Sequence, residues 1–177
     1  MNMYVLSNAM KSLLKPGDEV IVTNQDHEAN IGAWRRLANH GMVIKEWQIN
    51  SNTAELEIDD LKSLLSKKTR IVAVTHCSNI VGSINDLKSI AELVHQYDAY
   101  IVGDGVSYAP HLGLLYGKKE ILNKLPNQNH EFLEGDVPYT LNPGGPNHEE
   151  LSCLVGVYES FNNLFEHHFP GEDSSVR

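Results

Sequence analysis

Polar side chains stand where apolar, strand-like runs of the sequence end, and their types suit a binding site for a planar, charged ligand. Asp104 follows the run Tyr100–Val102 and precedes a glycine. A carboxylate there can pair with a cationic group of a cofactor, as the partner of a pyridinium does, or it can cap the turn that follows. His27 follows the run Glu19–Thr23, where its ring could stack on a planar ligand or be an ordinary loop histidine.

A third apolar run, Arg70–Val74, is followed by a cluster of side chains that form hydrogen bonds: Thr75, His76, Ser78 and Asn79. Each is ordinary alone, but together, with a glycine close behind them, they could hold a polar ligand. Cys77 lies among them, and a small buried cysteine is a better interpretation than a nucleophile. Further along, Gly144-Gly145 could let backbone amides approach an anion, although Pro-Gly-Gly-Pro is also a common turn.

The elements that would position these residues alternate between strand and helix. Strands are predicted at Glu19–Thr23, Val43–Ile49, Arg70–Val74, Tyr100–Val102 and Leu112–Gly117. Helices are predicted at Met1–Leu14, Ile31–Asn39, Glu57–Lys68, Leu87–Gln96, Lys118–Leu125 and His148–Phe165. The repeated strand–helix–strand order predicts an α/β fold with a mostly parallel sheet and right-handed crossovers. Ligands bind at the carboxyl edge of such sheets, so His27, Asn79 and Asp104 are expected along one edge.

Composition and charge narrow the class of partner. The chain has 177 residues, 41% of them hydrophobic, which predicts one globular domain over residues 1–169 and a disordered tail over 170–177. A net charge of -9 argues against nucleic acid and anionic membranes as partners. No apolar run is long enough to span a bilayer, and the start lacks the pattern of a signal peptide. The two cysteines lie far apart and the histidines have no metal-binding spacing, so we expect no metal and a cytoplasmic location.

Five segments, which are distributed along most of the chain, match the motifs of a known family in the family's order. They are GDEVIVTNQDHEANIGAW, VAVTHCSNIVGSIND, VGDGVSYAPH, GLLYGKKE and TLNPGGPNHEE. In these segments the sequence resembles the class V aminotransferases, a family of pyridoxal-phosphate enzymes, and among them the cysteine desulfurase-like group. The resemblance implies a three-layer α/β large domain of a fold-type I transferase, incomplete here, with pyridoxal phosphate as cofactor and amino acids as substrates.

The resemblance also assigns cofactor-binding roles to individual residues. His27 would stack on the pyridoxal ring, and Asp104 would pair with the pyridine nitrogen. Asn79 would lie near the phenolic oxygen of the cofactor and the substrate, with Ser107 near the same oxygen. The loop at Gly144-Gly145 resembles one that approaches the phosphate of the partner subunit's cofactor, so a homodimer or a pair with a full-length relative is expected.

Three parts of the family pattern have no counterpart in this sequence. A phosphate-binding turn would precede the first helix, and a small domain, with the region of the desulfurases' catalytic cysteine, would follow the last. Inside the chain, His111 runs directly into Leu112, where the family has a strand-and-helix unit and the lysine that forms the Schiff base. Such a unit is about 30 residues long. An incomplete sheet and a poorly stable chain are therefore expected.

The missing lysine decides the functional prediction. Lys118 and Lys119 match an exposed turn of the family and not the lost lysine, so no catalytic residue is expected in this chain. The sequence therefore indicates a catalytically disabled relative of these enzymes. The alternatives are a non-catalytic partner of a full-length relative and a fragment without function. A plain nucleotide-binding domain is disfavoured, because neither glycine-rich phosphate motif is present.

Overall fold

The computed structural model describes residues 2–105, 113–137 and 139–172. These residues fall into two units, which are treated separately below. The first contains residues 2–105 and 117–143 and holds the sheet, and the second contains residues 113–116 and 144–172.

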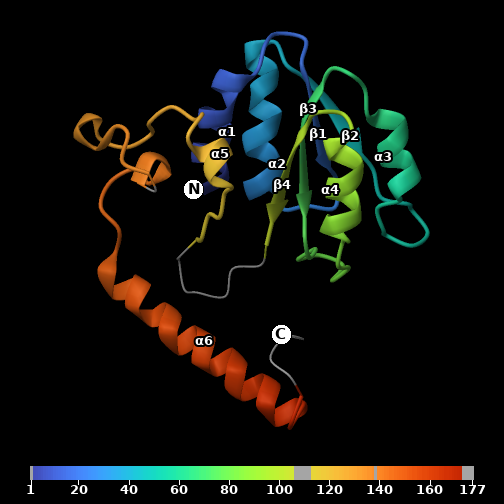
Figure 1. Cartoon of the computed structure of the whole chain (residues 1–177). Helices are drawn as coiled ribbons and strands as arrows, with labels where there is room; N and C mark the ends of the chain where they lie inside the picture. Colours follow the sequence, from blue (N-terminus) through green and yellow to red (C-terminus); the bar gives the residue numbers. More distant parts are fainter. Residues whose placement is uncertain (1, 106–112, 138, 173–177) are drawn as a thin grey trace. The chain divides into compact units, whose positions relative to one another are not determined.

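The first unit is built on a parallel sheet of four strands in the order β2-β1-β3-β4 (Figure 1). The strands are β1 (Glu19–Thr23), β2 (Val43–Trp47), β3 (Thr69–Thr75) and β4 (Tyr100–Asp104). All the pairings are parallel, with Thr23 opposite Trp47 and Thr75 opposite Asp104 at the carboxyl edge. The parallel α/β sheet predicted from the sequence is therefore confirmed.

Helices cover both faces of this sheet, which gives the predicted three layers (Figure 1). On one face lie α1 (Asn2–Met10) with the 3-10 turn η1 (Lys11–Leu13), and α2 (Glu28–Arg35) with η2 (Arg36–His40). On the other face lie α3 (Ile58–Leu64) and α4 (Leu87–His95). The remaining elements of the unit are α5 (Lys119–Leu122), η3 (Glu131–Leu133) and η4 (Tyr139–Leu141).

Each face of the sheet carries its own apolar core. Ile21, Val72 and Val74 pack with residues of α3 and α4 and with the fully buried Trp47. Successive strand residues point to opposite faces, so the neighbours of these residues face α1 and α2, where Trp34 is fully buried. Burial on both faces explains why β1 and β3 read as continuous apolar runs and not as alternating ones.

Helix caps explain where the helices begin. Asp86 caps α4, because its side chain accepts hydrogen bonds from the amides of Lys88 and Ser89, as expected of an Asn-Asp pair. The helix predicted at Ile31–Asn39 begins three residues earlier, at Glu28, because His27 acts as its cap. Histidine is not a usual capping residue, so the sequence pattern missed this start.

The strand predicted at Leu112–Gly117 is wrong for its described part, residues 113–117, which belong to no helix or strand. Leu114 and Tyr116 are 73% and 91% exposed. The run is apolar, but a strand also needs a neighbour for its backbone N–H and C=O groups, and none pairs with these residues. Within the described chain, β4 pairs with β3 alone.

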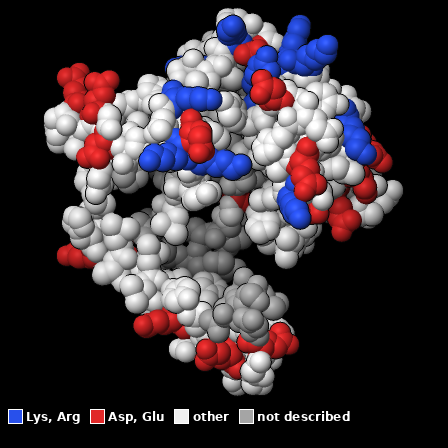
Figure 2. Space-filling view, in the orientation of Figure 1, with Lys and Arg blue, Asp and Glu red and all other residues white. Residues whose placement is uncertain are grey.

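The second unit consists mainly of α6 (His148–His168). Asn147 caps it by accepting a hydrogen bond from the Glu150 amide, and the predicted helix is confirmed and three residues longer than expected. The helix has four glutamates and no lysine or arginine, and Figure 2 shows only acidic charges along it. None of the helices that the structure describes is both long and apolar enough to cross a membrane.

Candidate functional site

The ends of β3 and β4 are joined at the carboxyl edge of the sheet. The His76 amide donates a hydrogen bond to the Asp104 carbonyl at 2.7 Å, and the Thr75 hydroxyl donates to the same oxygen at 3.4 Å. Asp104 therefore lies beside the polar cluster that follows β3, as the sequence predicted. The adjacency follows from the parallel register, which places Thr75 opposite Asp104.

The Asp104 side chain faces the α2 side of the sheet. Ile101 packs with the core on the α4 side, and Gly103 lies against Leu87 of α4, so alternation places Asp104 on the other face. Burial raises the pKa of Asp104 above its ordinary value, and the charge of nearby His27 partly offsets this rise. In the described part of the chain no hydrogen bond is made to its carboxyl oxygens. The structure thus places His27 close enough to Asp104 for its charge to act on the carboxyl group.

His27 is held in place at one ring nitrogen. Its Nδ1 accepts a hydrogen bond from the Ala29 amide at 3.0 Å, which caps α2. This hydrogen bond sets the orientation of the ring. Because the residue is exposed, the rest of the ring remains open to a ligand.

Behind His27 lies a buried chain of polar side chains that sequence reasoning missed. Asp26 accepts hydrogen bonds from the His27 amide, at 2.8 Å, and from the Asn30 side chain. Trp34 donates from Nε1 to the Asn30 side-chain oxygen at 2.9 Å. Asp26, Asn30 and Trp34 are spaced four residues apart, with Asn30 and Trp34 on one face of α2 and Asp26 two residues before the helix begins. The four-residue spacing was a signal in the sequence. The hydrogen bonds among these side chains connect the His27 loop to the core.

Burial raises the pKa of Asp26 to about 6, although the Asn30 and His27 hydrogen bonds lower it. The ordinary value is 3.8, so between about pH 4 and pH 6 the folded chain holds a proton that the unfolded chain has released. The fold is therefore destabilised as pH rises through this window. We expect urea unfolding to show wild type losing roughly 2 kcal/mol relative to Asp26→Asn between pH 4 and pH 7. A difference that stays constant with pH would contradict this.

A second group of polar side chains, the amide clamp, joins the loops after β1 and β3. Gln25 and Asn85 are its buried centre, and Asn85 Nδ2 donates to Gln25 Oε1 at 2.8 Å and to the Thr75 carbonyl at 2.9 Å. Gln25 Nε2 donates to Ser83 Oγ at 2.9 Å, and Ser78 Oγ donates to the Gln25 carbonyl at 3.1 Å. The Ser78 hydroxyl is therefore engaged inside the protein, and its predicted role toward a ligand is replaced by a structural one.

Asn79, Ser107 and the loop at Gly144 complete the predicted cofactor site. Asn79 lies in an exposed turn, and no hydrogen bond joins its side chain to His27 or Asp104 in the described structure. Ser107 lies outside the described residues. Gly144 adopts φ +94°, a conformation that favours glycine, in the loop before α6. No group of three or more His, Cys, Asp or Glu side chains among the described residues could hold a metal ion.

The comparisons with known proteins agree on one family. The model of the aminotransferase class-V family matches residues 1–121. The aminotransferase-like protein FGM3 of Gibberella zeae is 38% identical over 87% of this chain and 42% of its own length. A probable cysteine desulfurase of Synechocystis is 29% identical over 92% of this chain and 47% of its own. The cysteine desulfurase CsdA of Escherichia coli has the same fold, with a TM-score of 0.82 at 22% identity over 91% of this chain and 50% of CsdA.

The lengths of these matches reveal unmatched residues in the relatives. The FGM3 match extends over 181 positions but covers 87% of 177 residues, about 154, so about 27 positions face gaps in this chain. The Synechocystis match extends over 201 positions and covers 92%, about 163 residues, which leaves about 38. The chain spans about half the length of these relatives, and it also lacks residues within the part that matches.

Proposed function

Because the chain belongs to the class V aminotransferase family, we propose that it derives from a cysteine desulfurase-like pyridoxal-phosphate enzyme and no longer catalyses its reaction. The proposal includes amino acids as the ancestral substrates, a homodimer or a pair with a full-length relative, and a cytoplasmic location. It also treats residues 1–169 as part of the large domain of such an enzyme.

The residues at the carboxyl edge fit part of a pyridoxal-phosphate site. Asp104 offers a half-buried carboxyl group without a hydrogen-bond donor among the described residues, which suits a protonated pyridine nitrogen. His27 offers an exposed ring, held at Nδ1, that can stack on the pyridine ring. When bound, the cofactor supplies an electron-withdrawing ring that stabilises negative charge on an amino-acid substrate. The protein would bind this ring and keep a proton on its nitrogen.

The proposed loss of catalysis is supported by one observation, namely that about 27 positions of the FGM3 match face gaps in this chain. Their number is similar to the length of the strand-and-helix unit that the family motifs place, with the cofactor-binding lysine, between His111 and Leu112. Among the described residues, no lysine shifts the pKa of Asp104, as an amine beside the cofactor site would. Without that amine the chain has no covalent attachment for the cofactor and no base beside the substrate.

Pyridoxal phosphate is therefore expected to bind this chain weakly and reversibly. Replacing Asp104 by asparagine removes a charge-assisted hydrogen bond and should weaken binding about tenfold. Asp98→Asn is the matched control, because Asp98 is exposed and lies at the other end of β4. Titration followed by absorbance measures the affinity, and borohydride reduction followed by peptide mapping detects covalent attachment.

Two results would count against the proposal. Stoichiometric labelling of a single lysine would show that a catalytic amine is present after all. Equal affinities in wild type and Asp104→Asn, or no binding, would show that the carboxyl edge no longer recognises the cofactor, and a fragment without function would then be favoured. The proposal requires weak binding that depends on Asp104, and scattered or absent labelling.

A further inference from the structure

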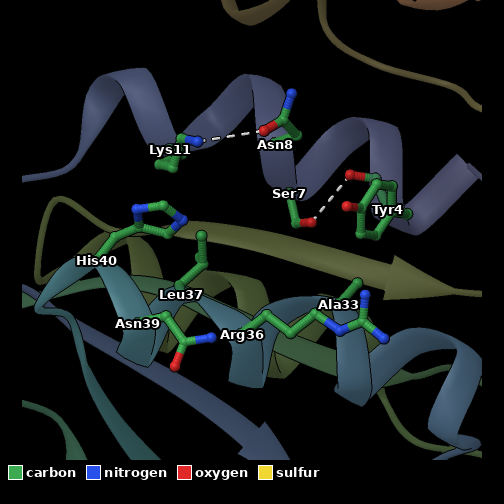
Figure 3. A pocket seen from close by; sticks show the side chains of 9 residues that line it. All are labelled: Tyr4, Ser7, Asn8, Lys11, Ala33, Arg36, Leu37, Asn39 and His40. Carbon is green, nitrogen blue, oxygen red and sulfur yellow. Dashed lines mark hydrogen bonds between the residues drawn. The ribbon is translucent and has the colours of Figure 1, made fainter.

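A polar groove lies between α1 and α2 in the first unit (Figure 3). Its volume is about 210 Å³. One wall comes from α1 and η1 and the other from α2 and η2. The lining residues are Tyr4, Ser7, Asn8, Lys11, Ala33, Arg36, Leu37, Asn39 and His40.

The groove follows from the spacing of residues along both helices. Each helix turns residues three, four and seven positions apart toward its neighbour. The floor is formed by buried side chains, among which Ser7 and Ala33 are small. Because these small residues meet where the helices pack, the longer side chains at the rim stand apart and leave a hollow between them.

The rim of the groove is cationic. Arg36 lies over the Tyr4 ring, 5.6 Å from its centre, and no carboxylate pairs with its guanidinium in the described chain. Lys11 donates to the Asn8 side chain at 3.3 Å and likewise has no acidic partner there, and His40 lies beside it in Figure 3. No aspartate or glutamate lines the groove, although the whole chain has a net charge of -9. Elsewhere in the same unit Arg35, Lys45 and Arg70 are paired with carboxylates.

The groove is separate from the carboxyl edge that carries His27 and Asp104. The Gly41 carbonyl accepts a hydrogen bond from the Gly17 amide, just before β1 begins. The end of the groove with Lys11 and His40 therefore lies toward the amino edge of the sheet. A ligand in the groove would not occupy the candidate cofactor site.

We propose that this groove binds a small molecule with two or more phosphate groups. A guanidinium gives a planar pair of N–H donors that matches phosphate oxygens, and an ammonium adds a second positive charge. Arg36 stands at one end of the groove and Lys11 at the other, so separate anionic groups can be bound at once (Figure 3). The side-chain amide of Asn39 adds a neutral donor, whereas the Asn8 amide nitrogen already donates to Gln128 at 2.7 Å.

The test is isothermal titration of the full chain with pyrophosphate at low ionic strength. We expect saturable binding that weakens about tenfold in Arg36→Gln and in Lys11→Gln, and that decreases as salt is added. Lys88→Gln is the matched control, because it removes the same charge from an exposed position on α4, across the sheet. Circular dichroism establishes that each variant is folded before its affinity is measured.

Three outcomes would overturn the proposal. The first is no saturable binding of pyrophosphate by the wild-type chain. The second is an equal loss of affinity in Lys88→Gln and Lys11→Gln, which would indicate a general effect of net charge. The third is tighter binding of citrate than of pyrophosphate, which would assign the groove to carboxylates instead of phosphates. None of these outcomes depends on whether pyridoxal phosphate binds at Asp104.

Discussion

Inserting the missing strand-and-helix segment between His111 and Leu112 is expected to give the chain a single lysine that pyridoxal phosphate labels covalently. The segment is taken from the Synechocystis relative, whose match leaves about 38 positions unpaired with this chain. With Asp104 and His27 holding the ring as proposed, the inserted amine would meet an oriented cofactor. Labelling should rise to about one cofactor per chain after borohydride reduction, because a positioned amine acts as an intramolecular nucleophile.

The matched control carries the same insertion with its lysine replaced by glutamine. It should fold equally well and lose the specific label, as judged by mass spectrometry of reduced peptides. Cooperative unfolding of both insertion variants must be established first, so that a missing label is not a consequence of misfolding. A folded insertion variant without a unique label would contradict the proposal that the missing segment alone removes the covalent attachment of the cofactor.

Replacing Trp34 by alanine is expected to cost the fold about 4 kcal/mol, which is much of the stability of a small domain. Trp34 is fully buried between α2 and the sheet, so its loss leaves a cavity. It also donates a hydrogen bond to the equally buried Asn30, whose side-chain oxygen would then lack a partner. Because Asn30 is bonded to Asp26 in turn, the loop that carries His27 should loosen as well.

Trp34→Phe separates the two contributions, since phenylalanine keeps most of the ring but has no N–H donor. We expect this variant to lose about 1–3 kcal/mol, the cost of one unsatisfied buried group. Urea denaturation followed by circular dichroism gives both free energies of unfolding. A loss below about 1 kcal/mol for Trp34→Ala would mean that this core is loosely packed and that Trp34 does not hold the His27 loop.

Most strands of the sheet could be predicted from the sequence because they contain short apolar runs rich in β-branched residues, and β2 could be predicted because apolar and polar residues alternate along it. The runs at β1 and β3 are buried on both faces, and their ends therefore marked the edge at which Asp104 and His27 meet. The parallel order β1-β3-β4 then places the ends of these strands at one edge, where the charge of His27 acts on Asp104 although β3 lies between their strands. Fold and edge follow from local patterns and the geometry of βαβ units.

The parts that could not be predicted depend on partners distant in sequence. Gln25 and Asn85 are 60 residues apart, and nothing local in the sequence marks either as the partner of the other. The segment at 113–117 shows the converse case, because its apolar pattern suits a strand but none of the described strands pairs with it. A local apolar pattern can favour a strand, but the strand forms only where another strand pairs with its backbone.

The amide clamp has a consequence for the entropy of ligand binding. Gln25 and Asn85 are almost fully buried, and their hydrogen bonds join the loops after β1 and β3 before any ligand is present. A ligand at the carboxyl edge would find these loops already ordered and would lose little conformational freedom in binding there. Their amide protons should exchange slowly with solvent, unlike those of ordinary surface loops. The amide clamp thus gives the carboxyl edge of the sheet a preorganised frame.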